Sequence, residues 1–448
     1  WIASRIDSTA TAYNIVAGLR ITGVFDGQVL CDALQDVVER HEALRTTYPS
    51  TATGTVQRVS SHRRVTVDIV DARGCGPVPT TELFDAVTAQ PFDLSADLPV
   101  RARVLRTADD EHLLALVVHH IAADGESVPA LSRDLLFSYA SREQGQRPVW
   151  PSEPLQYAEY RLALDAAMAD GIGATGLEYW TRVLEAVPHE HGLPLDMPRP
   201  TTATGRADTV SASISADLRA RVAATARTHR ASEFMVLHAT VAAPVAEIGG
   251  VADVVIGTPH SGRGGTAVDS MVGMAVNTLA LRMNVSRSAT FAETIAEARE
   301  VDLEAFEHAM IPFDAVVSAV AAPRHAARHP IVQIMLAVQD SAPLSMSTGE
   351  RSISMIDAPI TQSAFDLVVT VRPSHDGGAD LRITFSRDLF LPSTARTLAE
   401  RLVELLDRAS AQPSATVAEF VDASNVRTGP LLLGEFVDRA VLLDADAV

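Results

Sequence analysis

Short apolar runs separated by amphipathic segments most constrain how this chain of 448 residues can fold. The longest, Leu113–Val118 and Ile331–Val338, are far shorter than the roughly 18 apolar residues of a membrane-spanning helix. The nearly continuous run His112–Val118 is typical of a strand buried on both faces. Apolar residues three and four apart in Gly27–Thr46 and Ser127–Arg142 predict helices. We therefore expect a mixed α/β fold without a membrane-spanning helix.

Two Pro-rich regions, which interrupt regular secondary structure, indicate that the chain forms two lobes. Arg142–Gln156 and Pro188–Arg206 are rich in Pro and bracket a short helical segment, as expected where a chain crosses between lobes. We predict an N-terminal lobe over residues 1–165, a C-terminal lobe whose loops cross to the first over residues 166–408, and a tail or linker toward a following domain over residues 409–448. In the second lobe the patterns predict helices at 231–246, 290–309 and 393–409, and strands at 253–256, 331–338, 365–371 and 381–386.

The charged residues exclude several classes of enzyme. The formal net charge is −19, and all 37 basic residues are Arg, so the chain has no Lys. Pyridoxal-phosphate enzymes, P-loop proteins and protein kinases each need a Lys, and Arg cannot replace it as a nucleophile because it stays protonated. A pI of about 5.1 argues against a nucleic-acid partner, which needs a basic face.

Residues for metal binding or disulfide formation are few. Cys31 and Cys75 form neither a metal-binding spacing nor a disulfide framework, so we expect a reducing, cytoplasmic location. His189 and His191 lie in a Pro-rich loop without a third ligand, so no metal site is predicted.

The strongest functional signal is at residues 117–127, VVHHIAADGES, where a predicted strand ends and a helix begins. Adjacent strand residues point to opposite faces, so only one of His119 and His120 can face a given cavity. Histidine is the usual general base, and Gly125 permits a tight turn. Ser127 can cap the helix, while Asp124 can orient the His120 ring or be engaged elsewhere. A lone His at a strand end is most often a packed core residue, but this combination favours a functional site.

The pattern His-His-x-x-x-Asp-Gly resembles the core motif of the condensation domains of nonribosomal peptide synthetases, members of the chloramphenicol-acetyltransferase-like superfamily. Other segments resemble motifs of this family in the same order: Tyr13–Ile15, Arg40–Thr46, Pro91–Leu94, Ile256–Pro259, Gly262–Arg263, Val272–Met274, Val276–Leu279, Ile311–Phe313, His329–Met335 and Arg387–Phe390. The resemblance spans residues 1–407.

The resemblance implies an α/β fold of two chloramphenicol-acetyltransferase-like lobes in a V-shaped pseudo-dimer, with the active site in a tunnel between them. It implies amide formation between a donor acyl or peptidyl thioester and the α-amine of an acceptor aminoacyl thioester, of L-donor, L-acceptor type. Alternatives are an epimerization domain, a non-catalytic recruiting member of the fold and an ester-forming acyltransferase. His119-His120 excludes the cyclization variant, which carries Asp in place of His.

The resemblance also implies roles for individual residues. His120 is the catalytic residue, as a base or as a group that positions the amine, and Gly125 lies beside the reacting thioester. Asp124 holds its loop through an ion pair with Arg263, and His119 is structural. Glu126, which stands where many members carry an aromatic residue, is expected to line the tunnel together with Ser127, Asn277 and Gln333.

No permanently bound cofactor is implied. The phosphopantetheine arms of donor and acceptor peptidyl carrier proteins are expected to bring the substrates, and an adjacent adenylation domain to supply them. The sequence has no Gly-rich Ser attachment motif and no catalytic Lys of an adenylation domain, so it must use carriers loaded elsewhere. No membrane partner is expected.

Overall fold

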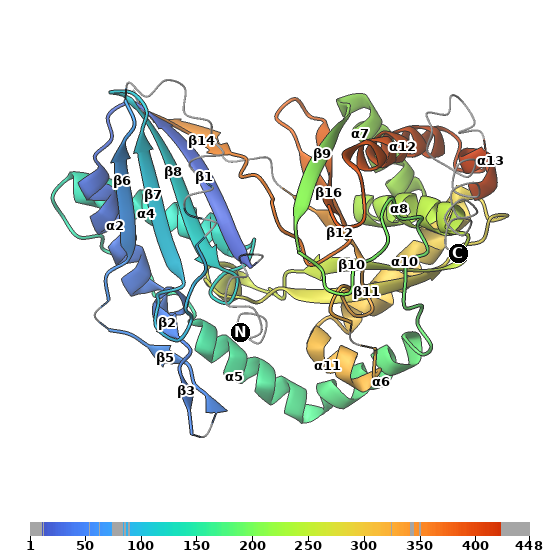
Figure 1. Cartoon of the computed structure of the whole chain (residues 1–448), viewed down its shortest axis with the longest axis horizontal. Helices are drawn as coiled ribbons and strands as arrows, with labels where there is room; N and C mark the ends of the chain where they lie inside the picture. Colours follow the sequence, from blue (N-terminus) through green and yellow to red (C-terminus); the bar gives the residue numbers. More distant parts are fainter. Residues whose placement is uncertain are drawn as a thin grey trace, which may run out of the picture.

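Two six-stranded sheets, one in each of two lobes that lie side by side, organise the chain (Figure 1). The computed structural model describes residues 11–422 except residues 12, 53, 62, 74–83, 85–86, 88–89, 324, 341–344 and 349–350. Each lobe packs helices against its sheet, so the mixed α/β class predicted from the sequence is confirmed.

The sheet of the N-lobe combines strands from distant parts of the chain. Its order is β13 (Ser345–Thr348), β14 (Arg351–Ile356), β1 (Asn14–Thr22), β8 (Glu111–His119), β7 (Val100–Arg106) and β6 (Thr66–Asp71), with only β6 and β7 parallel. Strand β8 lies between β1 and β7 and is buried on both faces, as its apolar run predicted. Leu114 and Val118 face one hydrophobic cluster, whereas Leu113 and Val117 face another that contains Phe92.

Two helices, α2 (Gly27–Arg40) and α4 (Ser127–Glu143), pack together in the cluster on one face of this sheet. Asp26 caps α2 by accepting backbone N–H groups of its first turn. The buried carboxylate of Asp36 accepts a hydrogen bond of 2.6 Å from Arg142, which joins α2 to α4. The helix predicted over residues 27–46 ends early, at Arg40. It is followed by a short 3-10 helix, η1 (Glu42–Arg45), and by the short strands β2 (Thr46–Thr47), β3 (Ser50–Thr51), β4 (Gly54–Thr55) and β5 (Arg58–Val59).

The sheet of the C-lobe has the order β11 (Asn277–Asn284), β10 (Asp253–His260), β12 (Ile334–Val338), β15 (Leu367–Pro373), β16 (Ala379–Ser386) and β9 (Ala207–Ile214). The pairs β10–β12 and β12–β15 are parallel and the others antiparallel. Strand β10 continues beyond the predicted end at residue 256, because Gly257 pairs with both neighbouring strands. Close approach favours a glycine here, since a side chain at 257 would collide with Val332 and Met335.

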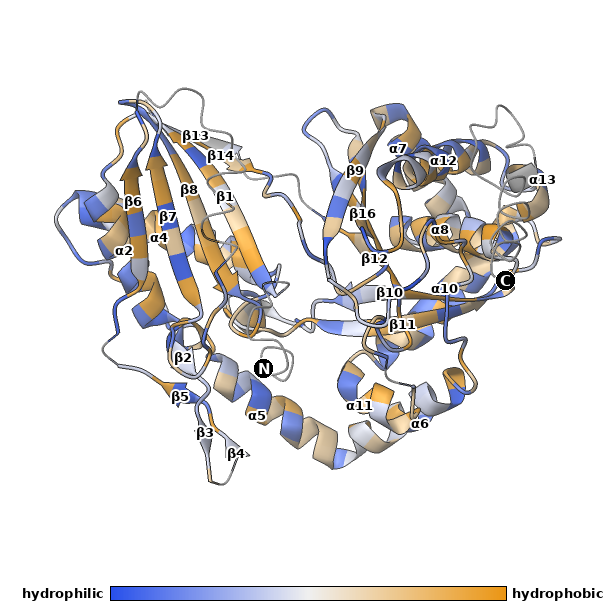
Figure 2. Ribbon diagram, viewed as in Figure 1, coloured by the Kyte–Doolittle hydropathy of each residue, from blue (hydrophilic) through white to orange (hydrophobic). Residues whose placement is uncertain are grey.

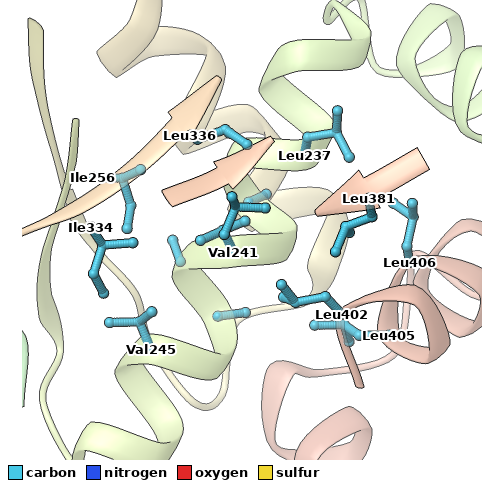
Figure 3. Packing of buried hydrophobic residues seen from close by; sticks show 14 of the residues in the cluster. Leu237, Val241, Val245, Ile256, Ile334, Leu336, Leu381, Leu402, Leu405 and Leu406 are labelled. Carbon is cyan, nitrogen blue, oxygen red and sulfur yellow. The ribbon is translucent and has the colours of Figure 1, made fainter. Parts of the chain in front are cut away.

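The hydrophobic core of the C-lobe lies around α8 (Glu233–Gly249), which is buried over most of its length. Figure 3 shows Val241 of α8 among strand residues such as Leu336 and residues of α12 (Pro392–Ala411) such as Leu402. The other described helices of this lobe include α7 (Ala216–Thr228), the short α9 (Thr266–Asp269), α10 (Phe291–Glu307), α11 (Phe313–Ala319) and α13 (Val417–Asp422). Helix α10 begins with a capping box between Thr290 and Glu293, in which each side chain accepts from the other's backbone N–H.

The end of the C-lobe differs from the expected boundary at residue 408. Helix α12 continues to Ala411, and Val417 and Phe420 of α13 are buried in the core of the lobe. Residues 409–422 therefore belong to the C-lobe rather than to a tail, because their apolar side chains fill its core. Residues 423–448 lie outside the described part of the chain.

The chain crosses between the lobes more than once. After β12 of the C-lobe it enters the N-lobe sheet as β13 and β14, and it then returns as β15. A helical run of α5 (Tyr157–Ala167), η2 (Met168–Ile172) and α6 (Gly173–Val183) connects the lobes along the bottom of Figure 1. The expected lobe boundary at residue 165 thus lies inside a helix that joins the two lobes.

Figure 2 shows hydrophobic residues along the strands of the N-lobe sheet, whereas α2 carries both hydrophobic and hydrophilic residues. This distribution follows the burial of each element. Strand β8, buried on both faces, is apolar over most of its length, whereas β7 alternates hydrophobic residues with Arg and α2 is apolar on one side. In the part of the chain that the structure describes, no helix combines the length and the apolar character needed to cross a bilayer.

Substitution of Ile353 tests whether β14, which comes after the C-lobe strand β12 in the chain, is part of the N-lobe sheet. Its side chain is 6% exposed, lies opposite Ile21 of β1 and packs in the N-lobe core. Ile353→Ala is expected to lower the free energy of unfolding by about 2–5 kcal/mol, because it removes buried methyl groups and leaves a cavity. Urea denaturation followed by circular dichroism measures this change.

Ile360, which is 50% exposed, provides the matched control. Ile360→Ala is expected to change the free energy of unfolding by less than about 0.5 kcal/mol. Equal effects of the two substitutions would contradict the position of β14 in the core.

Candidate active site

The site predicted from the sequence lies on the turn between β8 and α4. Strand β8 ends at His119, and α4 begins at Ser127. His120 follows the strand, and its backbone N–H donates to the carbonyl of Tyr13 at 2.7 Å. The two histidines therefore have different surroundings, since one is held in a sheet and the other opens a turn.

His119 is a buried structural residue. Its ring Nδ1 accepts the backbone N–H of Ile121 at 3.1 Å, which leaves the proton of the neutral ring on Nε2. The ring packs edge-on against Phe92, with 6.0 Å between ring centroids. Burial lowers the pKa of His119 to about 4, so the ring stays neutral at physiological pH.

His120 has a different environment. Its side chain is partly exposed, and the described residues give its ring no hydrogen-bond partner. A ring nitrogen without a protein partner can act on a substrate group that reaches it.

The carboxylate of Asp124 is completely buried, at 0% exposure. One oxygen, Oδ1, accepts from Arg263 at 2.7 Å and from the backbone N–H and hydroxyl of Ser127 at 2.9 and 2.7 Å. The other, Oδ2, accepts the backbone N–H groups of Ala275 and Val276 at 2.9 and 3.2 Å. These partners use the carboxylate, so Asp124 does not orient His120.

Arg263 completes this arrangement from the C-lobe, in the connection between β10 and β11. Its buried guanidinium donates to the carbonyls of Val268 and Met271 at 2.8 and 2.7 Å, in addition to Asp124. The ion pair implied by the family resemblance is therefore present. We call Asp124, Ser127, Arg263 and the backbone of residues 273–276 the interlobe clamp.

Two glycines let the β10–β11 connection approach the N-lobe this closely. Gly262 has a φ of +65°, and a side chain there would collide with the carbonyl of Ala275. Gly273 lies against the ring of Tyr157, and a Cβ at 273 would come within 2.6 Å of that ring. The hydroxyl of Tyr160 adds a hydrogen bond of 3.1 Å to the carbonyl of Gly262.

Ser127 was expected to line a tunnel and to cap α4, and both expectations are wrong. The side chain has 0% exposure, and its hydroxyl donates to Asp124 and accepts the backbone N–H of Gly273 within the clamp. Asp124 instead supplies the hydrogen bonds at the start of the helix. Its side chain accepts the backbone N–H of Ser127, and the backbone N–H of Asp124 donates to the Ser127 hydroxyl at 3.2 Å.

The other residues expected in the tunnel wall have varied positions. Gln333 is buried, and its Nε2 donates to the carbonyl of His329 at 3.1 Å, so it is not a lining residue. The side-chain amide of Asn277 holds the segment before α11 in place. It donates to the carbonyls of Ala309 and Ile311 and accepts the backbone N–H of Phe313.

Gly125 and Glu126 are exposed on the turn, and nothing lies within 4 Å of a Cβ built on Gly125. Their expected roles remain predictions.

Groups that could bind a metal do not gather elsewhere in the part of the chain that the structure describes. No cluster of three His, Cys, Asp or Glu side chains suited to a metal occurs among the described residues. His191 instead contacts the buried carboxylate of Asp366 at 3.2 Å, which also pairs with Arg199. Cys31 is a free thiol whose pKa is raised by burial, and Cys75 lies outside the described residues.

The family of the chain follows from its sequence. The family model described as "Condensation domain" matches residues 1–431. The chain belongs to the condensation-domain family. This condensation domain is 34% identical to an isonitrile lipopeptide synthase of Mycobacterium tuberculosis over 99% of the chain, and 32% identical to a dimodular nonribosomal peptide synthase of Bacillus subtilis over 92% of the chain. It spans only 18% of the length of each of these relatives.

Solved structures share the fold of this condensation domain. The X-domain from teicoplanin biosynthesis, solved in complex with OxyB, is 28% identical, with a TM-score of 0.82 over 91% of this chain and 90% of its own. The first condensation domain of the calcium-dependent antibiotic synthetase, solved with a substrate analogue, is 21% identical, with a TM-score of 0.77 over 94% and 96% of the two chains. The fold is therefore the chloramphenicol-acetyltransferase-like fold of condensation domains, as expected.

Sequence reasoning missed several residues beside His120. Ile121, Tyr157 and Met274 border a pocket next to the turn, together with residues near β4. Ile121 and Met274 stand inside motifs that the sequence did point to, but periodicity does not indicate which motif residues border an open space.

Asp124 is expected to stabilise the fold through the clamp. Asp124→Ala is expected to lower the free energy of unfolding by about 3–5 kcal/mol, because it leaves the buried guanidinium of Arg263 without its counter-charge. Urea denaturation measures the change. In the control Asp165→Ala, at a carboxylate that is 61% exposed and pairs with Arg161, the loss is expected to stay below about 1 kcal/mol. Unchanged stability of Asp124→Ala would contradict the structural role.

The buried His119 ring makes stability depend on pH. The unfolded chain binds a proton near the ordinary pKa of 6.5, and the folded chain binds it only near 4. This single group is therefore expected to remove roughly 3 kcal/mol of unfolding free energy as the pH falls from about 6.5 to about 4.

His119→Asn removes this contribution, so its stability is expected to fall less steeply over the same pH range than that of the wild type. Denaturation at a series of pH values measures the difference. His375→Asn, at an exposed turn, is the control and is expected to keep the wild-type slope. Identical slopes for His119→Asn and the wild type would contradict the neutral buried ring.

Proposed function

We propose that the chain joins two thioester-bound groups through an amide bond, with His120 as the catalytic residue. One observation carries the proposal: the His120 ring is partly exposed and has no protein hydrogen-bond partner in the described part of the chain, on a turn fixed by the clamp. The His, Asp and Gly of the family motif are all present, which supports an active rather than an idle member.

The reaction needs little beyond orientation. The amine nitrogen of the acceptor attacks the thioester carbonyl carbon of the donor, the carbon–sulfur bond breaks, and the donor carrier leaves as a thiol while the amine loses a proton. A thioester is already activated, so holding the two groups together can supply about 7–11 kcal/mol of the barrier. His120, as a base or as the group that positions the amine, adds about 10²–10⁴-fold.

The oxygen of the tetrahedral intermediate needs a donor as well. In the proposal the exposed backbone of Gly125, at the start of α4, offers its N–H to this oxygen. The positive end of a helix dipole favours negative charge at the same point.

The substrates are proposed to arrive on the phosphopantetheine arms of donor and acceptor carrier proteins, with an adenylation domain supplying the amino acids. The sequences support this, because this condensation domain is similar to small parts of much longer peptide synthetases. For the stereochemistry we retain the L-donor, L-acceptor form implied by the family resemblance.

A second candidate function is recruitment of another protein without catalysis. The similarity to the X-domain of teicoplanin biosynthesis, solved in complex with OxyB, favours it. The two candidates differ in a single measurement, since a recruiting domain forms no amide from loaded carriers.

His120→Ala tests the proposed chemistry. With a donor and an acceptor loaded on carrier proteins, the substitution is expected to lower the rate of amide formation by at least about 10²–10⁴-fold. Mass spectrometry of the carrier-bound product measures the rate, with L- and D-donors compared in parallel. The melting temperature is expected to stay near that of the wild type, because the ring is partly exposed.

His375→Ala, on an exposed turn of the C-lobe, is the control and is expected to keep the wild-type rate. A near-normal rate for His120→Ala would contradict the assignment of His120. Absence of product with the wild-type chain would favour the recruiting function.

A further inference from the structure

A pocket of about 310 Å³ opens beside the His120 turn. Five apolar or aromatic side chains border it, those of Ile121, Met274, Tyr48, Tyr157 and Val56. None of the described residues that border it is charged, because the remaining two are Thr55 and Gln57. The pocket is therefore a neutral, mostly apolar space at the edge of the candidate site.

The pocket begins one residue from the proposed catalytic group. Ile121 follows His120 directly, and consecutive Cα atoms are about 3.8 Å apart. The backbone N–H of Ile121 donates to His119, which fixes the turn on which both residues lie. A group bound in the pocket therefore lies beside the turn that carries His120.

The interlobe clamp fixes the part of the pocket wall that contains Met274. Met274 lies between Gly273, whose N–H and carbonyl both bond to the Ser127 hydroxyl, and Ala275, whose N–H donates to Asp124. Tyr157 packs against Gly273. These contacts set the backbone of the wall before any substrate binds, so the width of the pocket is a property of the folded chain.

The chemistry of the walls selects the kind of group that fits. Burial raises the pKa of Tyr48 and of Tyr157, so both phenols are neutral at physiological pH. A charged group would lose its hydration without gaining a counter-ion among the bordering side chains, which is costly. An apolar group gains from contact with Ile121, Val56 and Met274, and a volume of this order suits a small group rather than a large ligand.

We propose that this pocket binds a neutral apolar side chain or acyl chain of one of the two thioester-bound substrates and limits its size. The inference rests on the proposed function, because it assigns part of the substrate of the same reaction. The apolar group belongs either to the donor acyl chain or to the acceptor side chain, and both sources share the same chemistry.

Val56 can be substituted to change the volume of the pocket with little effect on folding. Its side chain is 38% exposed, and Val59, three residues further along and 42% exposed, does not border the pocket. Val56→Trp fills the space, Val56→Ala enlarges it, and Val59→Trp controls for the added bulk.

The experiment measures kcat/KM with loaded carriers in two arms. In the first arm the donor is acetyl or hexanoyl with a fixed alanyl acceptor, and in the second the acceptor is alanyl or leucyl with a fixed acetyl donor. Val56→Trp is expected to lower kcat/KM for the larger substrate by roughly 10–200-fold in one arm, while the smaller substrate keeps its value. Val56→Ala is expected to raise kcat/KM for the larger substrate relative to the smaller one in the same arm, and Val59→Trp to match the wild type.

The arm in which selectivity changes identifies the source of the apolar group. Unchanged selectivity in both arms, or an equal loss for small and large substrates, would overturn the pocket assignment while leaving the proposed function intact. If Val56→Trp does not fold, unchanged selectivity of Val56→Ala overturns it. Absence of product with the wild-type chain would overturn the proposed function, and this inference with it.

Discussion

The buried ion pair between Asp124 and Arg263 is the interaction on which the rest of the site depends. A carboxylate without exposed surface is tolerated only if other groups satisfy its charge and its lone pairs. Asp124 meets this condition with one guanidinium, one hydroxyl and three backbone N–H groups from two lobes. The requirement joins three segments at one point: the end of β8, the start of α4 and the connection between β10 and β11.

The interlobe clamp at this point fixes the position of the candidate site between the two lobes. The turn that carries His120 begins at a strand fixed by its neighbours in the sheet and ends at the clamp, so its backbone has little freedom. The same clamp fixes Met274, which faces the adjacent pocket. An amine attacking a thioester needs mainly correct orientation. A chain without Lys, metal-binding spacing or nucleotide motif can therefore support this chemistry with one partly exposed His on a rigid turn.

Much of this arrangement could be predicted from the sequence because its signals are local. The run His112–Val118 indicated a strand buried on both faces, Gly125 indicated a turn after it, and the apolar pattern of Ser127–Arg142 indicated the following helix. The pairing of Asp124 with Arg263 came from the family resemblance, since no periodicity connects residues 139 positions apart. The exchange of β14 into the N-lobe was missed, because its partner β1 lies more than 300 residues away. Ser127 and Gln333 were assigned to a tunnel wall, since sequence indicates that a residue belongs to a motif but not whether its side chain faces an open space or a buried network.

Amide hydrogen exchange of the β10–β11 connection tests most directly whether the interlobe clamp is closed in solution. The backbone N–H groups of Gly273, Ala275 and Val276 donate to Ser127 and Asp124, whereas Gly264 and Gly265 of the same connection are exposed. If the clamp is closed, the first three amides are expected to exchange far more slowly than the other two, since their exchange requires the clamp to open. Equally fast exchange of all five in the folded chain would contradict a closed clamp.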